Sequence, residues 1–395
     1  MKRFLISAVA IVLGLGIQST YAVPGAHASK KMYSNAPIRT NFVLPSVDGL
    51  NCYTADLHVH TIFSDGEVSP EERVKEAWID GLDILAITDH IETRRQERTW
   101  LKFLKGYSPD KKGFEQINTR CSRGVHADSR GIVSDLNLSV ELARKAAKSY
   151  PELTIIKGTE ISREPEHIGH YCALFTTDNN IIYSTDDAQA IRNARAQGAI
   201  ITHNHPGWER LSTNYTEFEK KIYAEGLIDG IEVTNGKDFY PEIVRRAVEK
   251  KLYMVSATDI HATTASIYGK QNFYRDMTLI FAKDKSEKSL RKAFLSQKTL
   301  GYCGGYIIGE ESLLKKFFLA SVSAKAAGGG KHGAKISITN HSSFDYTLKH
   351  NGRVWQLPAF QTIVIPLFGK EPIFSVENMY HVDEKHPIVK LTINK

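Results

Sequence analysis

The stretch Asp56-Leu57-His58-Val59-His60-Thr61 follows an apolar run and indicates what the rest of the chain builds. Side chains alternate faces along a β-strand, so His58 and His60 are expected to point the same way and to bind one metal ion together. Four other apolar runs also end in residues of types that can bind metals. These ends are Thr88-Asp89-His90, Gly158-Thr159-Glu160, His203-Asn204-His205-Pro206 and Thr258-Asp259-Ile260-His261. His170 stands at the start of a further apolar run. Ligands delivered repeatedly by strand ends predict one metal centre at the rim of a single sheet or barrel.

The pattern of strands and helices predicts an α/β fold. Amphipathic helical patterns separate most of the apolar runs, and parallel strands joined by helices form (β/α) barrels with the active site at the C-terminal ends of the strands. The connection from Glu160 to His170 is too short for a helix, so we expect a distorted seven-stranded (β/α) barrel. The strands are expected near 53–59, 83–88, 153–158, 170–175, 198–203, 228–234 and 252–258, and the helices near 70–80, 135–149, 187–197, 215–226 and 240–250.

Two regions depart from this pattern. The long charged insertion Thr93–Ser134 predicts a lid or substrate loop. Beyond Glu287 the chain predicts helices over 287–299 and 310–325 and then a flexible link at Ala326–Lys331. The last part shows short β-type runs broken by Asn, Gly and Pro. We therefore expect a barrel with a helical extension over 23–325 and a small all-β antiparallel domain over 334–395.

The N-terminus predicts export. Met1-Lys2-Arg3, an apolar run and Thr20-Tyr21-Ala22 form a signal-peptide pattern, so residues 1–22 are expected to be removed and the protein to be periplasmic or extracellular. No later segment is apolar enough to span a bilayer. The net charge of +7 is scattered, which indicates attraction for anionic substrates rather than a nucleic-acid surface. The four cysteines (Cys52, Cys121, Cys172 and Cys303) are compatible with disulfides, although Cys172 is interpreted as a buried small hydrophobe.

The strand-end motifs, together with Ser64-Asp65-Gly66, resemble the polymerase and histidinol phosphatase (PHP) family of metal-dependent phosphoesterases, and they follow the family's order from residue 54 to 261. The resemblance implies two or three divalent ions in a distorted seven-stranded barrel. It implies that the first ion is held by His58, His60, Glu160 and Asp259; that Glu160 bridges to a second ion completed by His170 and His205; and that Asp65, His90 and His261 hold a third. Some relatives have His where this chain has Asp65, so occupancy of the third site stays open.

The residue types support the same interpretation without the family. Burying so many imidazoles and carboxylates unpaired would cost several kcal/mol per charge, and bound cations remove that cost. Histidine and carboxylate ligands without thiolates suit Zn²⁺, Mn²⁺ or Fe²⁺. Such ions lower the pKa of bound water and hold both oxygens of an in-line displacement at phosphorus. Asp56 and Asp89 are expected to accept hydrogen bonds from ligand imidazoles.

Residues for substrate binding and proton transfer are harder to select. Arg163, three residues after Glu160, is our first choice for a contact with phosphate oxygens, with Arg94, Arg95 and Arg275 as alternatives; a solvated loop arginine is the competing interpretation. His203 or His261 is expected to protonate the leaving group. Asn235 stays ambiguous, and aromatic residues either line a substrate wall or pack within their own loops. The aromatic residues are Trp100, Phe103, Tyr107 and Trp208.

The sequence thus predicts an exported multinuclear-metal hydrolase that cleaves phosphate esters by metal-activated hydroxide. Small phosphodiesters or phosphomonoesters are the expected substrates, and diesters are favoured because secreted members of the family that it resembles include phosphodiesterases. Two alternatives remain open: hydrolysis of an amide or carboxylic ester on the same metals, and a non-catalytic cell-surface binding module. Nuclease activity is less favoured, since no basic stripe interleaved with aromatics occurs.

Overall fold

The computed structural model describes residues 38–93, 115–116, 132–133, 135–271, 273–330, 333–367 and 371–394. Residues from Asn41 to Lys395 form one compact unit. Several expectations lie outside the described residues. They concern the signal peptide, most of the Thr93–Ser134 insertion, Cys121, Arg94, Arg95, Trp100, Phe103 and Tyr107. Of the insertion, β3 (Glu115–Gln116) and β4 (Ile132–Val133) form a short antiparallel pair.

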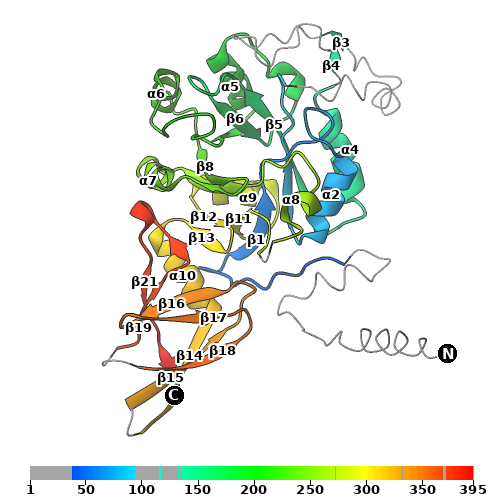
Figure 1. The fold of residues 1–395 in the computed structure, drawn as a ribbon. Coiled ribbons are helices and arrows are strands. Elements are labelled where there is room, and N and C mark those ends of the chain that lie inside the picture. The colour runs from blue at the N-terminus through cyan, green and yellow to red at the C-terminus, as the bar shows by residue number, and fades with distance from the viewer. Residues whose placement is uncertain are drawn as a thin grey trace, which may run out of the picture. The chain divides into compact units, whose positions relative to one another are not determined.

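The expected strands lie next to one another in one large curled sheet (Figure 1). Its strand order is β10-β8-β7-β6-β5-β2-β1-β11-β12-β13-β20, and the short β9 (Asp238–Phe239) pairs with β8. The seven expected strands are observed as β1 (Asn51–Asp56), β2 (Ile84–Ile87), β5 (Thr154–Ser162), β6 (His170–Leu174), β7 (Ile200–His203), β8 (Gly230–Asn235) and β10 (Tyr253–Ala257). The sheet continues through β11 (Met277–Ala282), β12 (Thr299–Cys303), β13 (Tyr306–Ile308) and β20 (Met379–Tyr380).

The seven strands of the expected distorted barrel are not all parallel. β6 runs antiparallel to both β5 and β7, because the connection after Ser162 is a short return rather than a helical crossover. β1 pairs antiparallel with β11, so the sheet extends past β1 instead of closing. β10 meets the opposite strands through side chains: Met254 N donates to Thr299 Oγ1 at 3.0 Å, and Ser256 N donates to Thr278 Oγ1 at 3.0 Å. The result is a curled half-barrel in a mixed α/β fold.

The expected helices are present at the predicted positions with local start signals. Ser69 caps the first of them by accepting a hydrogen bond from Glu72 N, and Thr216 and Glu219 form a reciprocal capping box. These helices are α2 (Pro70–Ile79), α4 (Leu138–Ala147), α5 (Asp187–Ala196), α6 (Glu217–Ala224) and α7 (Pro241–Lys250), and the chain adds α8 (Thr264–Tyr268), α9 (Glu287–Leu295), α10 (Glu311–Ser321) and the 3₁₀ turns η1 (Asn179–Ile181) and η2 (Val382–Glu384). Among the described residues, no helix has the length and apolarity that a membrane span requires.

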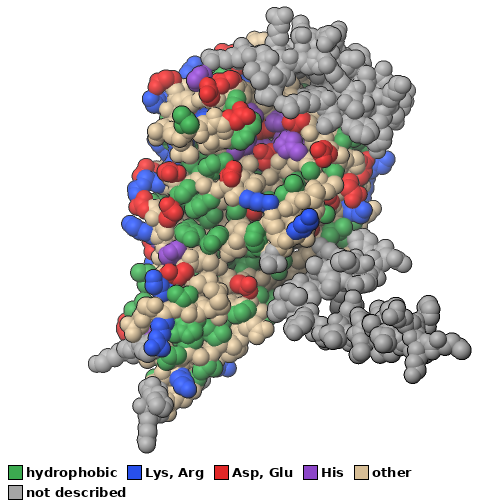
Figure 2. Space-filling view, in the orientation of Figure 1, with side chains coloured by type: hydrophobic (Ala, Val, Ile, Leu, Met, Phe, Trp, Pro, Cys, Tyr) green, Lys and Arg blue, Asp and Glu red, His purple; other side chains and the backbone are tan. Residues whose placement is uncertain are grey.

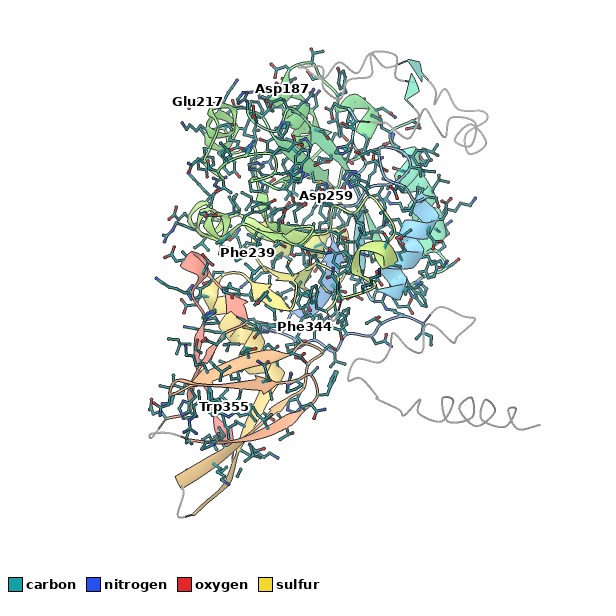
Figure 3. The ribbon with its side chains drawn as sticks, viewed as in Figure 1. Asp187, Glu217, Phe239, Asp259, Phe344 and Trp355 are labelled. Atoms are coloured by element: carbon teal, nitrogen blue, oxygen red, sulfur yellow. The ribbon has the colours of Figure 1, made fainter. Side chains whose placement is uncertain are left out.

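The C-terminal part forms two four-stranded sheets, as the short β-type runs predicted. It begins earlier than expected: α10 ends at Ser321, and the described part of the predicted flexible link, 326–330, lies within a strand that runs from Val322 to Gly330. Phe344 stacks on Tyr302 of the large sheet with ring centroids 4.7 Å apart (Figure 3), so the two parts share apolar packing. The sheets are β18 (Thr362–Pro366), β15 (Gly333–Asn340), β14 (Val322–Gly330) and β22 (Ile393–Asn394), and β17 (Arg353–Leu357), β16 (Tyr346–His350), β19 (Ile373–Val376) and β21 (Ile388–Lys390).

Candidate metal centre

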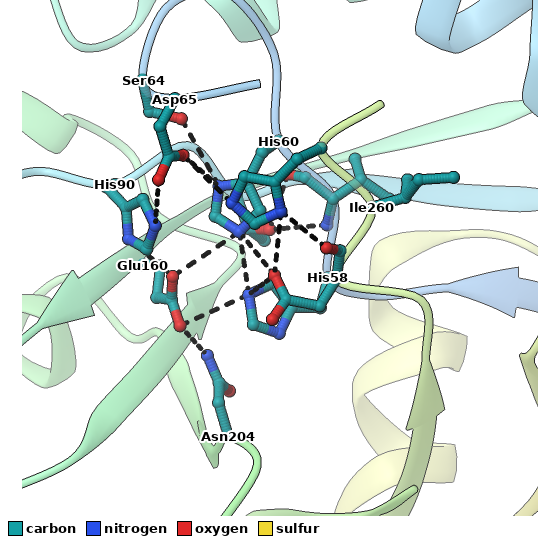
Figure 4. Close-up of polar contacts among 12 residues, drawn as sticks. His58, His60, Ser64, Asp65, His90, Glu160, Asn204 and Ile260 are labelled. Atoms are coloured by element: carbon teal, nitrogen blue, oxygen red, sulfur yellow. Dashed lines mark hydrogen bonds and ion pairs between the residues drawn. The ribbon is translucent and has the colours of Figure 1, made fainter. Parts of the chain in front are cut away.

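The nine residues selected from the sequence as metal ligands all lie in one cluster at one rim of the curled sheet. Figure 4 shows five of them, His58, His60, Asp65, His90 and Glu160, close together. His58 and His60 follow β1, His90 follows β2, and His205 follows β7, so each leaves the C-terminal end of a strand. His170 is the first residue of β6, and it reaches the same rim because β6 runs in the opposite direction. Figure 2 shows His and acidic side chains gathered together on one part of the visible face.

Glu160 lies in the middle of the cluster and contacts five imidazoles. Its Oε1 lies 3.3 Å from His58 Nε2, 3.3 Å from His170 Nδ1 and 3.6 Å from His205 Nε2. Its Oε2 lies 2.7 Å from His90 Nδ1 and 3.6 Å from His60 Nε2. A carboxylate in this position can serve two ions at once, one on each oxygen.

Two further carboxylates contact the imidazoles of the cluster: Asp259 contacts His58 and His60, and Asp65 contacts His90 and His261. Asp259 Oδ1 lies 2.9 Å from His60 Nε2 and 3.3 Å from His58 Nε2. Asp65 Oδ1 lies 3.2 Å from His261 Nε2, and its Oδ2 lies 3.4 Å from His90 Nε2. His261 is the most accessible imidazole of the cluster, with 38% of its side chain exposed.

The donor atoms fit divalent cations. Nitrogen and oxygen atoms of three sets lie within 4.8 Å of one another: His60, Asp65, His90 and His261; His58, His205 and Asp259; and His90, Glu160 and His170. His58 Nε2 faces His60 Nε2 at 3.1 Å, as the strand alternation predicted. Glu160 Oε2 and His170 Nδ1 are buried and make ion-pair contacts, but neither makes a well-aligned hydrogen bond with another described residue. Lone pairs that converge without donors between them are typical of a metal site.

The electrostatics of the cluster reflect this crowding. Burial alone would raise the pKa of Glu160, but the surrounding imidazoles outweigh it and hold the pKa well below its ordinary value. Asp65 and Asp259 are affected in the same way. Burial and the neighbouring His261 and His90 lower the pKa of His60 to about 4. His60 is therefore neutral and the carboxylates are ionised near neutral pH, the states in which each binds a metal.

Two residues of the cluster have unusual backbone conformations. His205 has φ of 23° and Asp259 has φ of 49°, and neither is a glycine. Such conformations are strained for L-residues and persist where the surrounding structure enforces them, often at functional sites. His60 N donates to Ile260 O at 3.2 Å, and Asp259 N donates to His58 O at 2.9 Å, so the backbones after β1 and β10 are held together.

Glu232 and Asn204 support the cluster, and the sequence analysis missed both. Glu232 is fully buried in β8; its Oε1 lies 2.8 Å from His58 Nδ1, and its Oε2 accepts from His205 N at 2.6 Å. This carboxylate thus orients His58 so that Nε2 faces the cluster. Asn204 Nδ2 donates to Glu160 Oε1 at 2.6 Å. A single acid within the apolar strand Gly230–Asn235 was the available signal for Glu232.

The structure does not place Arg163 toward the cluster. Its guanidinium is buried, lies 3.1 Å from Glu92 Oε1 and 3.4 Å from Asp187 Oδ1, and donates to Ser184 O at 2.7 Å. Only its backbone carbonyl faces a ligand, accepting from His170 Nε2 at 3.0 Å. The expectation of a phosphate contact is therefore not supported, and Arg163 instead supports the loop that carries His170.

His203 also lies apart from the cluster. It is fully buried, with Nδ1 3.0 Å from the Tyr223 hydroxyl and Nε2 3.2 Å from Glu219 Oε1. β7 ends at His203, and Asn204, the next residue, turns towards Glu160 instead. Arg210 also pairs with Glu219. Burial alone would raise the pKa of Glu219, but His203 and Arg210 lower it to about 2.

Asp56, Asp89 and Arg275 have partners other than the expected ones, and Asn235, whose role the sequence left open, also has a partner in the structure. Asp89 accepts from Thr61 and Ser64, and Asp56 pairs with Arg275, so neither accepts from an imidazole N–H of the described residues. Arg275 is thereby buried in an ion pair rather than exposed to a phosphate. Asn235 donates to Glu232 at 2.8 Å and belongs to the support of the cluster.

The described cysteines form no disulfide, and Trp208 lies beside the cluster. Cys52, Cys172 and Cys303 are free thiols. Cys172 is buried as expected, and burial raises the pKa of its thiol. Trp208, one of the aromatic residues considered for a substrate wall, lies beside the rings of His170 and His205.

Comparisons with known proteins agree with this geometry. A family model for the PHP domain matches residues 56–274, which include all nine cluster residues. A solved two-domain protein from Bacteroides vulgatus, described as containing a predicted PHP-like metal-dependent phosphoesterase, is 29% identical, with 90% of this chain and 99% of that chain covered and a TM-score of 0.76. An uncharacterized protein of Methanocaldococcus jannaschii is 25% identical over 209 residues, which are 52% of this chain and 81% of the relative.

Proposed function

Because the chain belongs to the PHP domain family and is a metal-dependent hydrolase, we propose that it cleaves small phosphate esters, either diesters or monoesters, after export from the cytoplasm. The observation that carries this proposal is the convergence of nine ligand-type residues around Glu160, whose two oxygens contact different sets of imidazoles. Paired cations suit in-line displacement at phosphorus because they bind the attacking and leaving oxygens together.

The proposed ligand sets are those that the family resemblance implied, and all their members lie in the cluster. His58, His60, Glu160 and Asp259 would hold a first ion, and Glu160 would share a second with His170 and His205. His170 and His205 contact Oε1 of Glu160 and His60 contacts Oε2, so ligands proposed for the two ions face both oxygens of this carboxylate. A third ion would take Asp65, His90 and His261, which contact one another at the more open side. Zn²⁺, Mn²⁺ or Fe²⁺ suits this donor set.

The ions, when bound, would activate water and withdraw charge from the phosphoryl oxygens. The protein's own groups then have two tasks, to hold the ligands in place and to supply a proton. Glu232 fixes His58 and the backbone at His205, which limits rearrangement during turnover. His261, exposed and beside Asp65, is the proposed proton donor to the leaving group wherever the third site is empty.

Phosphate charge has no arginine partner among the described residues near the cluster. Arg163 and Arg275 are committed to buried carboxylates. Arg73 donates to the backbone carbonyls of His60, Ile260 and His261 and so fixes the two loops that carry ligands. We therefore propose that bound cations supply most of the neutralising charge.

The test is a substrate panel with one leaving group. Chelator-treated protein is reconstituted separately with Zn²⁺, Mn²⁺ or Fe²⁺ and assayed on bis(p-nitrophenyl) phosphate, p-nitrophenyl phosphate and p-nitrophenyl acetate. We expect metal-dependent release of p-nitrophenol from a phosphate ester, and none from the His58→Ala, His60→Ala double variant. Turnover of the acetate alone would contradict phosphate chemistry and favour carbonyl hydrolysis. A DNA oligonucleotide is expected to stay intact.

Export has its own test. The proposal rests on residues 1–22, whose charged start, apolar run and small residues form a signal-peptide pattern. Mass spectrometry of protein isolated from its native host should find a mature N-terminus near Val23. An intact Met1 in the mature pool would contradict export by this signal.

A further inference from the structure

Trp208 leaves a large aromatic surface in solvent beside the metal centre. Its ring centroid lies 5.3 Å from that of His170 and 5.1 Å from that of His205, and 39% of the residue is exposed. Both imidazoles also contact Glu160. An exposed indole costs free energy in water, so its position against two ligands calls for a physical explanation.

The turn that carries Trp208 is held in place on several sides. Trp208 N donates to His205 O at 2.9 Å, which closes a tight turn directly after the ligand. A Cβ at Gly207 would lie 2.7 Å from Cε1 of Tyr240, so only glycine lets the turn pack against that ring. Arg210 contacts Glu219 and the carbonyl of Pro165, which ties this turn to the loop before His170. The indole is therefore presented by a rigid support rather than by a loose loop.

The loop that carries Trp208 has a second exposed apolar side chain. Leu211 is fully exposed three residues further along the same loop. Trp208 and Leu211 thus place two exposed apolar side chains on the loop that follows the ligand His205. A ligand held by the cations would extend over the indole if it carried a flat apolar group next to its anionic group.

We propose that Trp208 forms a subsite for an aromatic group attached to the scissile phosphate ester. This inference rests on the proposed function, since the anionic group is what brings the ligand to the cations. Aromatic rings stack favourably on indole, and the preference is tolerant of the ring's identity because every such ring has a flat face. Aryl and heteroaryl esters are thereby preferred over alkyl esters of similar charge.

The test compares two ligands that cannot be hydrolysed. Binding of phenylphosphonate and of methylphosphonate to the metal-reconstituted full chain is measured by calorimetry, which requires no turnover. We expect the wild type to prefer the phenyl compound by about tenfold, since stacking supplies that much in comparable sites. Trp208→Ala should remove most of this preference, and Trp208→Phe should keep most of it. Trp355→Ala, the same change in the C-terminal sheet, serves as the matched control with the preference unchanged (Figure 3).

The outcomes separate failure of the aromatic subsite from failure of the phosphate-ester proposal. Equal binding of both phosphonates by the wild type, or an unchanged preference in Trp208→Ala with unchanged metal content, would overturn the subsite while leaving phosphate binding intact. If neither phosphonate binds, the phosphate-ester proposal fails, and the pair benzoate and acetate decides the subsite instead. Preference for benzoate that Trp208→Ala removes supports the aromatic subsite, and equal or absent binding of both overturns it.

Discussion

The substitution Glu232→Gln probes how the scaffold imposes metal binding, because this residue is expected to touch no ion. Its carboxylate oxygens face three donors: His58 Nδ1 at 2.8 Å, His205 N at 2.6 Å and Asn235 Nδ2 at 2.8 Å. An amide of the same shape keeps one accepting oxygen and replaces the other with an NH₂ group. If the oxygen stays with His205 and Asn235, the NH₂ group faces His58 Nδ1. The imidazole must then accept at Nδ1 and carry its proton on Nε2, the atom that faces the cluster.

The magnitude follows from what this change disturbs. Loss of a group that orients a ligand typically weakens metal affinity by about 10- to 100-fold, which corresponds to about 1.4 to 2.7 kcal/mol. The new amide has two N–H groups, and His58 Nδ1 accepts from one of them; the second is a buried donor that adds about 1 to 3 kcal/mol of destabilisation. The apo protein should thus become less stable, and the ion nearest His58 should be lost first.

The assay is equilibrium dialysis against a competing chelator with elemental analysis of the protein, alongside denaturant unfolding of the apo form. Glu242→Gln, the same change at an exposed position of α7, is the control and should alter neither measurement. Metal affinity of Glu232→Gln within about threefold of wild type at every site would refute the role assigned to Glu232 in orienting His58.

Three further predictions concern the contacts of Glu160, Arg163 and Glu219. Glu160→Gln should lower both metal content and turnover more than Asp65→Asn, because Glu160 contacts five imidazoles of the cluster; equal losses measured by elemental analysis and initial rates would contradict the shared-ligand assignment. Arg163→Ala should destabilise the fold by about 3 to 5 kcal/mol in denaturant unfolding, since it leaves Glu92 buried without its cation; an unchanged midpoint would contradict this. Glu219 has a folded pKa of about 2 against an ordinary 4.5, so it stabilises the fold above pH 4.5 and loses that contribution as the pH falls towards 2. Wild type should therefore lose about 3 kcal/mol more than Glu219→Gln over this interval in acid unfolding, and parallel curves would refute the assignment.

The sequence predicted which residues lie together in the cluster, because strand ends and ligand-type residues are local signals. His58 and His60 needed only the alternation of a strand, and their Nε2 atoms face each other as expected. The strands and helices of the barrel region also matched, since each carries its own periodicity and start signal. Strand direction was not local: the reversal of β6 depends on a short connection, and it is what brings His170 to the rim.

The supporting residues were less predictable because their partners are distant in sequence. Arg163 lies close to Glu160 along the chain, but its guanidinium is committed to Glu92 and Asp187, which sequence proximity could not reveal. Glu232 contacts His58 across 174 residues, and nothing near it in the sequence indicates this. A buried acid in an apolar strand requires a partner, and that rule would have selected Glu232 as a residue to explain.

The central claim is that one multinuclear metal centre is assembled around Glu160, and anomalous diffraction from crystals of the metal-reconstituted protein tests it most directly. Data collected on both sides of the absorption edge of the bound metal locate each ion without reference to activity. We predict two or three anomalous peaks among the nine cluster residues, with Glu160 in contact with two of them. A single peak, or peaks confined to other parts of the chain at full metal loading, would contradict the claim.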